Sequence, residues 1–179
     1  MIDYKKLFSE VLLTHKDDSK WIGALFGGIK IVSNTKVGEV GQDFIEKFCS
    51  FMKIDFEFPH KDDGRRLNQN PWDIKINGIK FELKTATEDT NKNFQFNHIR
   101  YHRPYDAVLC LGVAPDNLFF GIWTKSEIAT GRAGNLVSME KGANASYKLT
   151  KNQKTLASFD DFYGEIIKFT KNYYMISPK

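Results

Sequence analysis

The sequence lacks any apolar run long enough to cross a membrane. A spanning helix needs about 20 consecutive apolar residues, and no such stretch occurs in the chain. The first residues, MIDYKKLFSEV, place acids and lysines where a signal peptide requires an uninterrupted apolar core. We therefore expect a cytoplasmic protein with no membrane partner. The sequence also shows no internal repeat and no linker to a second domain.

Cysteine is scarce, and neither sign of charge is in large excess. Only Cys49 and Cys110 are present, each in an apolar neighbourhood, so buried free thiols are expected in preference to a disulfide or a metal site. The formal net charge is +4 and the pI is near 8.9. Such a mildly basic balance is compatible with a polyanionic partner but does not require one.

The overall amino-acid composition is typical of a globular protein. The chain has 179 residues, of which 41% are hydrophobic and 14% aromatic, enough to build one sizeable core. We expect a single domain, with an N-terminal helical extension over 1–35, a core over 36–124, and a loop with a C-terminal helix over 125–179.

Hydrophobic spacing predicts the elements of this domain. Helices are expected over 3–14, 36–52, 94–103 and 159–173, and strands over 54–58, 106–113 and 118–123, with a glycine-rich surface loop over 131–142. In the helix over 36–52, the residues expected to face the core are Val40, Phe44, Ile45, Phe48, Phe51 and Met52. Thr124 and Glu127 form a capping box that predicts one more short helix.

The most informative segment is WDIKINGIKFELKT, residues 72–85. The Asn-Gly dipeptide predicts a two-residue type I′ hairpin, because both positions tolerate positive φ. With this loop, Ile74 faces Phe81, and Asp73 lies directly opposite Glu82. Side chains alternate along a strand, so Lys84 shares a sheet face with both acids.

Two interpretations of this charged face are open. It is a solvated side of a hairpin, as is common in half-exposed antiparallel strands, or it is a metal site. Like charges directly opposite one another are unfavourable, which favours the second. A Mg²⁺ ion between Asp73 and Glu82 would offset their repulsion, since Mg²⁺ binds through one or two carboxylates plus phosphate oxygens. Lys84 beside it could orient water or offset phosphate charge.

The order of elements and the motif NPWDIKINGIKFELK, which carries Asp73, Glu82 and Lys84, resemble the PD-(D/E)XK superfamily of restriction-endonuclease-like nucleases. The resemblance covers residues 36–123. Trp72 stands between Pro71 and the acid, so the usual Pro-Asp dipeptide is loosened. The resemblance implies an α/β fold in αβββαβ order, with a central mixed sheet flanked by helices.

The resemblance also implies the site residues. Asp73, Glu82 and the Leu83 carbonyl would bind Mg²⁺, for which Mn²⁺ can substitute, and Lys84 would position the attacking water. Many members add a glutamate from the first core helix. Glu39 is the first candidate for that role and Glu46 the second, although several relatives carry this glutamate at the place of Gln42.

Residues around the motif are candidates for DNA contact, since lysine and arginine neutralise phosphates and amides read base edges. They are Lys36, Arg65, Arg66, Lys92, Asn93, Gln95, Asn97, His98, Arg100 and Arg103, with Arg132, Asn135, Lys141, Asn144 and Lys148 in the late loop. Each of them can equally be an ordinary solvated side chain. On a helix, His98 and His102 could also clamp zinc.

The function that the resemblance implies is a type II restriction endonuclease. It would hydrolyse DNA phosphodiesters at a short palindromic site by Mg²⁺-dependent attack of water, leaving 5′-phosphates. Double-stranded DNA and a second copy in a homodimer are the expected partners, and no nucleotide cofactor is expected. The alternatives are a Holliday-junction resolvase, a mismatch-nicking enzyme, a homing endonuclease, an RNA-processing nuclease and a non-catalytic DNA-binding module.

Overall fold

The structure is a computed structural model that describes residues 5, 6, 8, 10, 11, 19–63, 65, 67 and 70–176, apart from the side chains of Ser19 and Asn144. The helix predicted over 3–14 lies mostly outside these residues. Among the residues that the structure describes, no helix is long and apolar enough to cross a membrane.

Along the described chain, strands β1 to β6 follow helix α2 without an intervening helix. The helices are α2 (Asn34–Phe51), α3 (Lys125–Ala129) and α4 (Phe162–Ile176), with single 3₁₀ turns at Ser19–Trp21, Gly27–Lys30, Gly142–Asn144 and Phe159–Asp161. The strands are β1 (Phe56–Glu57), β2 (Ile74–Ile76), β3 (Ile79–Thr87), β4 (Asn93–Ile99), β5 (Ala107–Val113), β6 (Leu118–Thr124), β7 (Leu136–Glu140), β8 (Ser146–Asn152) and β9 (Ala157–Ser158).

A mixed sheet in the order β1-β2-β3-β5-β6-β9 forms the centre of the fold. Strands β3 and β5 are parallel, and the other neighbours are antiparallel. The predicted hairpin is confirmed, because Ile74 pairs with Phe81 and Ile76 with Ile79. Strand β5 is buried along its whole length, as its continuous apolar run predicted.

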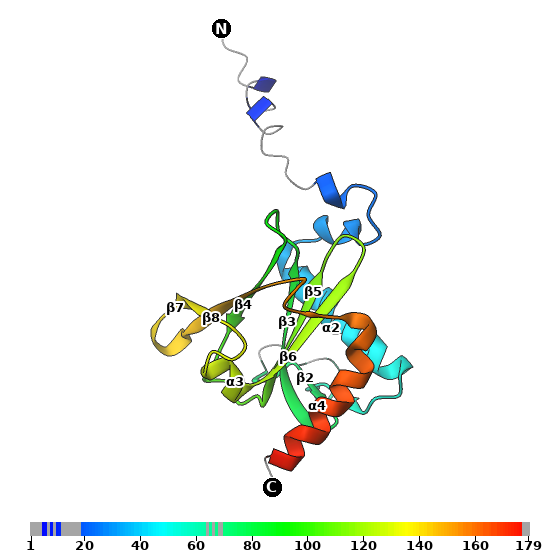
Figure 1. Cartoon of the computed structure of the whole chain (residues 1–179), viewed down its shortest axis with the longest axis vertical. Helices are drawn as coiled ribbons and strands as arrows, with labels where there is room; N and C mark the ends of the chain where they lie inside the picture. The colour runs from blue at the N-terminus through cyan, green and yellow to red at the C-terminus, as the bar shows by residue number, and fades with distance from the viewer. Residues whose placement is uncertain are drawn as a thin grey trace.

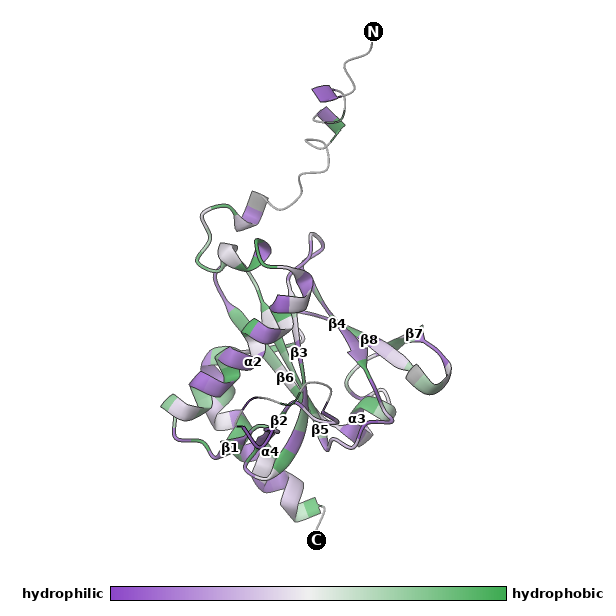
Figure 2. Cartoon of the chain, turned by 180° about the vertical axis from the view of Figure 1, so that it is seen from behind, coloured by the Kyte–Doolittle hydropathy of each residue, from purple (hydrophilic) through white to green (hydrophobic). Residues whose placement is uncertain are grey.

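Helices cover one face of this sheet, and a small second sheet covers the other (Figure 1). Ile45 of α2 and Ile166 of α4 belong to the same hydrophobic cluster as Phe81 of β3. On the opposite face, Phe94 and Phe96 of β4 pack with residues of β5. Figure 2 shows hydrophobic residues along the central strands. The predicted mixed sheet flanked by helices is therefore present.

The helix predicted over 94–103 is wrong, because this segment is strand β4 followed by a turn. Phe94 and Phe96 are fully buried while Gln95 and Asn97 are exposed, which is the alternation of a half-buried strand. Strand β4 joins β8 and β7 in an antiparallel sheet. The predicted αβββαβ order therefore fails at its second helix, where a strand connects the parallel strands β3 and β5.

The loop predicted over 131–142 is also corrected. Its later part is strand β7, which pairs with β8 through Leu136 opposite Leu149. Leu149 is fully buried and contributes to the cluster beneath the second sheet. The polar residues of the segment hid this hairpin from hydrophobic spacing, since only every second or third side chain reaches the core.

The two cysteines are free and buried, as predicted. Burial raises the pKa of Cys49 to about 12. Burial also raises the pKa of Cys110, with Lys84 among the groups that oppose the shift. Both side chains therefore remain neutral thiols at physiological pH.

Helix α2 approaches the sheet through Gly41. The predicted core stripe is partly wrong, because Val40 is 43% and Phe51 85% exposed, while Gly41 is buried. A Cβ atom on Gly41 would lie 2.9 Å from the Thr85 Cβ atom, closer than side chains pack. The absence of a side chain at Gly41 therefore lets α2 lie directly on β3.

Gly41→Ala is expected to destabilise the protein by about 1–3 kcal/mol, as overpacking of a tight contact does. The matched control is Gly38→Ala, on the same helix with no atom near its Cβ position. That control should be neutral or gain up to about 1 kcal/mol from helix propensity. Urea unfolding of the two variants measures the difference, and equal stabilities would contradict the close approach of α2 to β3.

Candidate active site

The hairpin fixes Asp73 at the start of β2. Its backbone N–H donates to the Phe81 carbonyl over 2.8 Å, one step before the first ladder pair. Its carboxylate oxygen Oδ2 accepts from the backbone N–H of Leu83, also over 2.8 Å. These two bonds hold Asp73 against β3, with its carboxylate beside Leu83, the residue after Glu82.

Glu82 is a fully buried carboxylate in the middle of β3. Lys84 Nζ lies 2.6 Å from its Oε1 atom, and Arg103 Nη1 lies 3.8 Å from Oε2. Neither oxygen nevertheless accepts a well-formed hydrogen bond. A buried carboxylate without hydrogen bonds is costly, so Glu82 has the properties of a ligand-binding group.

Glu82 lies close enough to Asp73 to affect the protonation of the Asp73 carboxylate. Burial and the neighbouring Glu82 charge raise the pKa of Asp73 above its ordinary value of 3.8, against the opposing effects of Lys84, the Leu83 N–H and Arg103. The structure therefore brings together Asp73, Glu82 and Lys84, as the hairpin register predicted. It also adds Arg103 as a second cation.

The raised pKa of Asp73 gives stability a pH dependence with a definite sign. The raised pKa means that the folded protein favours the protonated form of Asp73. This contribution to stability is fully present below the pKa of Asp73 in the unfolded chain, and it is lost as the pH rises through the pKa of Asp73 in the folded protein. Asp73→Asn cannot titrate and keeps an oxygen for the Leu83 N–H. Without metal, this variant should therefore gain stability relative to the parent protein as the pH rises from roughly 4 to 7.

Thermal unfolding of both proteins across this pH range, in EDTA, measures the difference. A constant difference in melting temperature would show that Asp73 carries no raised pKa. The control is Asn77→Asp. Asn77 lies on the same hairpin but outside the carboxylate pair, so this variant measures the effect of adding an acid to the turn.

The residues present fit a hard divalent cation. Carboxylate oxygens are the ligands that Mg²⁺ prefers, and two of them plus phosphate and water complete its shell. Because the N–H and C=O of one strand residue point to the same side, the Leu83 carbonyl also points toward Asp73. Within the described residues, no three histidine, cysteine, aspartate or glutamate side chains lie together so that they could hold a metal ion. A cation here would therefore rely on the carboxylate pair.

Glu39 and Glu46 are not brought to this pair. Both lie on α2, whose Gly41 contacts Thr85 on the helix-covered face of the sheet. Glu82 alternates with Thr85 and points to the opposite face, where it affects the pKa of Tyr105. Glu39 itself is exposed. The helix glutamate that the resemblance implies therefore has no counterpart at the described site.

The predicted DNA-contact residues are scattered. Lys36 is exposed in the first turn of α2, Arg65 pairs with Asp63, and Arg66 lies outside the described residues. On β4, the exposed Gln95 donates to Asp89. Asn97 and Lys148 lie on the outer side of the second sheet, away from Glu82. Four more of the predicted residues lie nearby along the same strands and turns: Asn93, Arg100, Asn135 and Lys141.

The zinc clamp considered for His98 and His102 is wrong, because no helix connects them. His98 has a φ of 59° at an irregular point of β4. Its Nδ1 atom lies 3.4 Å from the Ser146 hydroxyl and 3.8 Å from the Glu140 carboxylate. His98 therefore joins β4 to the β7-β8 hairpin.

The sequence analysis missed one residue of the site, Tyr105, and gave another, Arg103, a different role. Tyr105 is 3% exposed, and its hydroxyl has no hydrogen-bond partner within the described structure. Burial and the Glu82 charge raise its pKa. Arg103 was expected only as a phosphate contact, yet it lies beside Glu82. The only signal in the sequence was that Arg103 and Tyr105 come directly before the buried strand β5. The first residues of β5 pair with Phe81 and Glu82.

Comparisons with known proteins add little to this geometry. No family model and no curated protein matches the sequence. A solved structure of the bacterial homing endonuclease I-Ssp6803I is similar with 12% identity and a TM-score of 0.43, over 69% of this chain and 82% of that chain. A likeness at this level carries no argument about activity. The functional interpretation therefore rests on the residues and contacts described above.

Proposed function

We propose that the protein is a Mg²⁺-dependent endonuclease that hydrolyses DNA phosphodiester bonds. The observation that supports this most is the fully buried Glu82 carboxylate, which lies beside Asp73 and Lys84 with neither oxygen hydrogen-bonded. A cation held by the two carboxylates and the Leu83 carbonyl would lower the pKa of an attacking water and neutralise charge on the phosphate.

The protein's own residues supply the remaining chemistry. The Lys84 ammonium is 19% exposed, so it can reach both Glu82 and a group arriving from solvent. It orients the attacking water and offsets the charge that develops on the phosphate. Arg103, 22% exposed, is a second cation for the phosphate. The hydrogen bond from the Leu83 N–H keeps the Asp73 carboxylate aimed at this position.

DNA is the proposed substrate because the motif resembles those of DNA nucleases and the chain carries a net charge of +4. The more specific proposal is a type II restriction endonuclease that acts as a homodimer on a short palindromic site. Resolvase, mismatch-nicking and homing nucleases share the same chemistry and differ in the form of the substrate. A non-catalytic DNA-binding module would bind DNA equally well in EDTA and cut none.

One assay separates these functions. Unmethylated genomic DNA, a four-way junction and a mismatched duplex are incubated with the protein and Mg²⁺ or EDTA, and the fragment ends are sequenced. Discrete 5′-phosphate ends at one repeated motif support restriction, while cutting of the junction or mismatch alone supports the corresponding repair enzyme. The absence of any cutting in Mg²⁺ or Mn²⁺ would contradict the nuclease proposal.

A further inference from the structure

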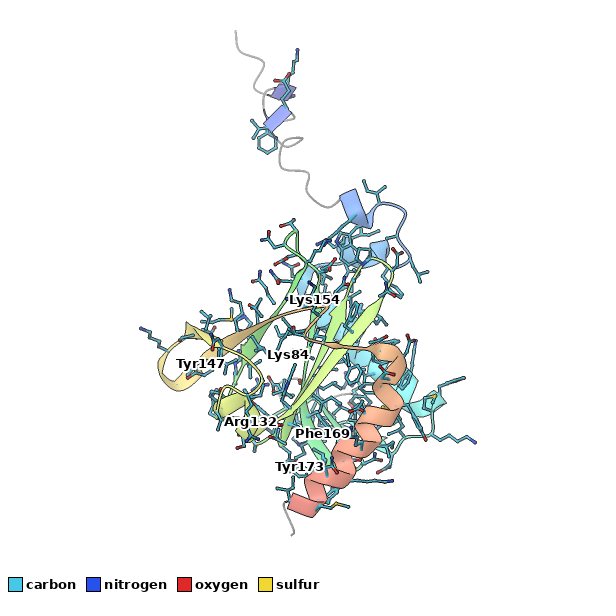
Figure 3. All side chains as sticks on the ribbon, in the orientation of Figure 1. Lys84, Arg132, Tyr147, Lys154, Phe169 and Tyr173 are labelled. Atoms are coloured by element: carbon cyan, nitrogen blue, oxygen red, sulfur yellow. The ribbon has the colours of Figure 1, made fainter. Side chains whose placement is uncertain are left out.

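A cavity of about 770 Å³ lies between the start of β5, helix α3 and the last turns of α4. It has the size of pockets that enclose most of a small organic ligand. Three of the residues that line it, Arg132, Phe169 and Tyr173, are labelled in Figure 3. The predicted site residues do not account for this cavity.

One wall of the cavity is aromatic. The rings of Phe169 and Tyr173 lie on successive turns of α4 with centroids 6.4 Å apart and planes inclined by 27°. Burial, the charge of Asp106 and a hydrogen bond to that carboxylate raise the pKa of Tyr173. This hydrogen bond restrains the Tyr173 ring, and a restrained aromatic face is a stacking platform for a planar ligand.

Two cations, Lys125 and Arg132, also line the cavity. Lys125 Nζ donates to the Arg103 carbonyl over 2.6 Å and lies 4.8 Å from the centre of the Tyr105 ring. Arg132 is exposed at the rim. Two acids also line the cavity: Glu127 caps α3, and Asp106 accepts from the Lys80 N–H. The exposed Arg132 is therefore the lining group placed to meet a phosphate that arrives from solvent.

The cavity is joined to the carboxylate pair through shared residues. Tyr105 lines the cavity and lies close enough to Glu82 for that charge to raise its pKa. Arg103 binds Lys125 through its carbonyl and approaches Glu82 through its guanidinium. Tyr105 and Arg103 therefore lie between the cavity and Glu82, and one DNA strand that binds at Glu82 can extend past them to the cavity.

We propose that this cavity binds one unstacked nucleotide of the DNA substrate, an inference that rests on the proposed function. The base stacks on Phe169 and Tyr173, Asn172 offers an amide to its edge, and Arg132 binds its phosphate. A fully paired duplex hides its bases in the stack. The substrate is therefore DNA in which one nucleotide is unpaired or is turned out of the duplex on binding.

Fluorescence anisotropy in EDTA tests the proposal without cleavage. The two probes are a labelled duplex with one unpaired 2-aminopurine and its fully paired counterpart. The parent protein should bind the first about tenfold more tightly, since stacking of one base contributes that much, and should quench the 2-aminopurine fluorescence. Tyr173→Ala and Arg132→Ala should each remove most of this preference, while Tyr173→Phe keeps it.

Tyr163→Ala is the matched control, because Tyr163 lies on the same helix but is 44% exposed and does not line the cavity. It should retain the full preference. Arg132 is exposed, so Arg132→Ala tests the pocket even if Tyr173→Ala unfolds the protein. Equal affinity for the two probes, with Mg²⁺-dependent cutting intact, overturns the pocket alone. Absence of both binding and cutting overturns the proposed function as well.

Discussion

Lys84→Ala is expected to lower the rate of Mg²⁺-dependent DNA cleavage by about 10²–10³-fold, as the loss of one group that stabilises transition-state charge does. Lys84 is the cation nearest to Glu82, with its ammonium 2.6 Å from the carboxylate. Single-turnover cleavage of a defined duplex at saturating protein measures the chemical step. DNA affinity should change far less than the rate, because one phosphate contact is a small part of binding.

Lys80→Ala is the matched control for this loss. Lys80 lies on the same strand and the same sheet face as Lys84, and its replacement by alanine also removes one positive charge. In the described structure, however, no ion pair joins Lys80 to Glu82. It should cleave at nearly the parent rate. If Lys84→Ala cut DNA as fast as Lys80→Ala, Lys84 would have no part in the reaction.

Lys84→Met is expected to destabilise the metal-free protein by about 3 kcal/mol, because it leaves the fully buried Glu82 without its nearest counter-charge. The double variant Glu82→Gln with Lys84→Met removes both charges. It should recover most of the lost stability, since a neutral pair of similar volume often replaces a buried ion pair without cost. Urea unfolding of the four proteins gives the coupling energy directly.

Additive effects of the two substitutions at neutral pH would mean that Glu82 and Lys84 do not interact in solution.

The hairpin could be predicted from sequence because its signals are local. Asn77 and Gly78 adopt φ values of 46° and 84°, as a type I′ turn requires. The turn then sets the register, and register sets which side chains share a face. The position of Asp73 and Glu82 followed from these two steps alone.

Strand β4 could not be predicted in the same way. Its stability comes from pairing with β8, about fifty residues later in the chain, and from Phe94 packing against Gly112. Short apolar runs carry helix and strand periods almost equally well, and Pro104 favoured a helix end. The error also concealed the second sheet and the turn that carries Arg103 and Tyr105.

The same distinction applies to the site residues: those placed by local contacts could be predicted, and those placed by distant contacts could not. Glu82 and Lys84 are two residues apart on one strand, so alternation placed them together. Glu39 was chosen by analogy, and the close contact of Gly41 with Thr85 puts its helix on the other face of the sheet. Tyr105 reaches Glu82 only because β5 lies parallel to β3 in a particular register. No feature of the sequence near Tyr105 indicated that register.

The central claim is that Asp73 and Glu82 share one divalent cation. Anomalous diffraction from crystals soaked in Mn²⁺ tests it directly, with Glu82→Gln crystals treated identically. The parent protein should show a peak bonded to both carboxylates, within about 2–2.3 Å of their oxygens, and the variant should show none. A Mn²⁺ peak elsewhere in the parent crystals, with none between Asp73 and Glu82, would contradict the claim.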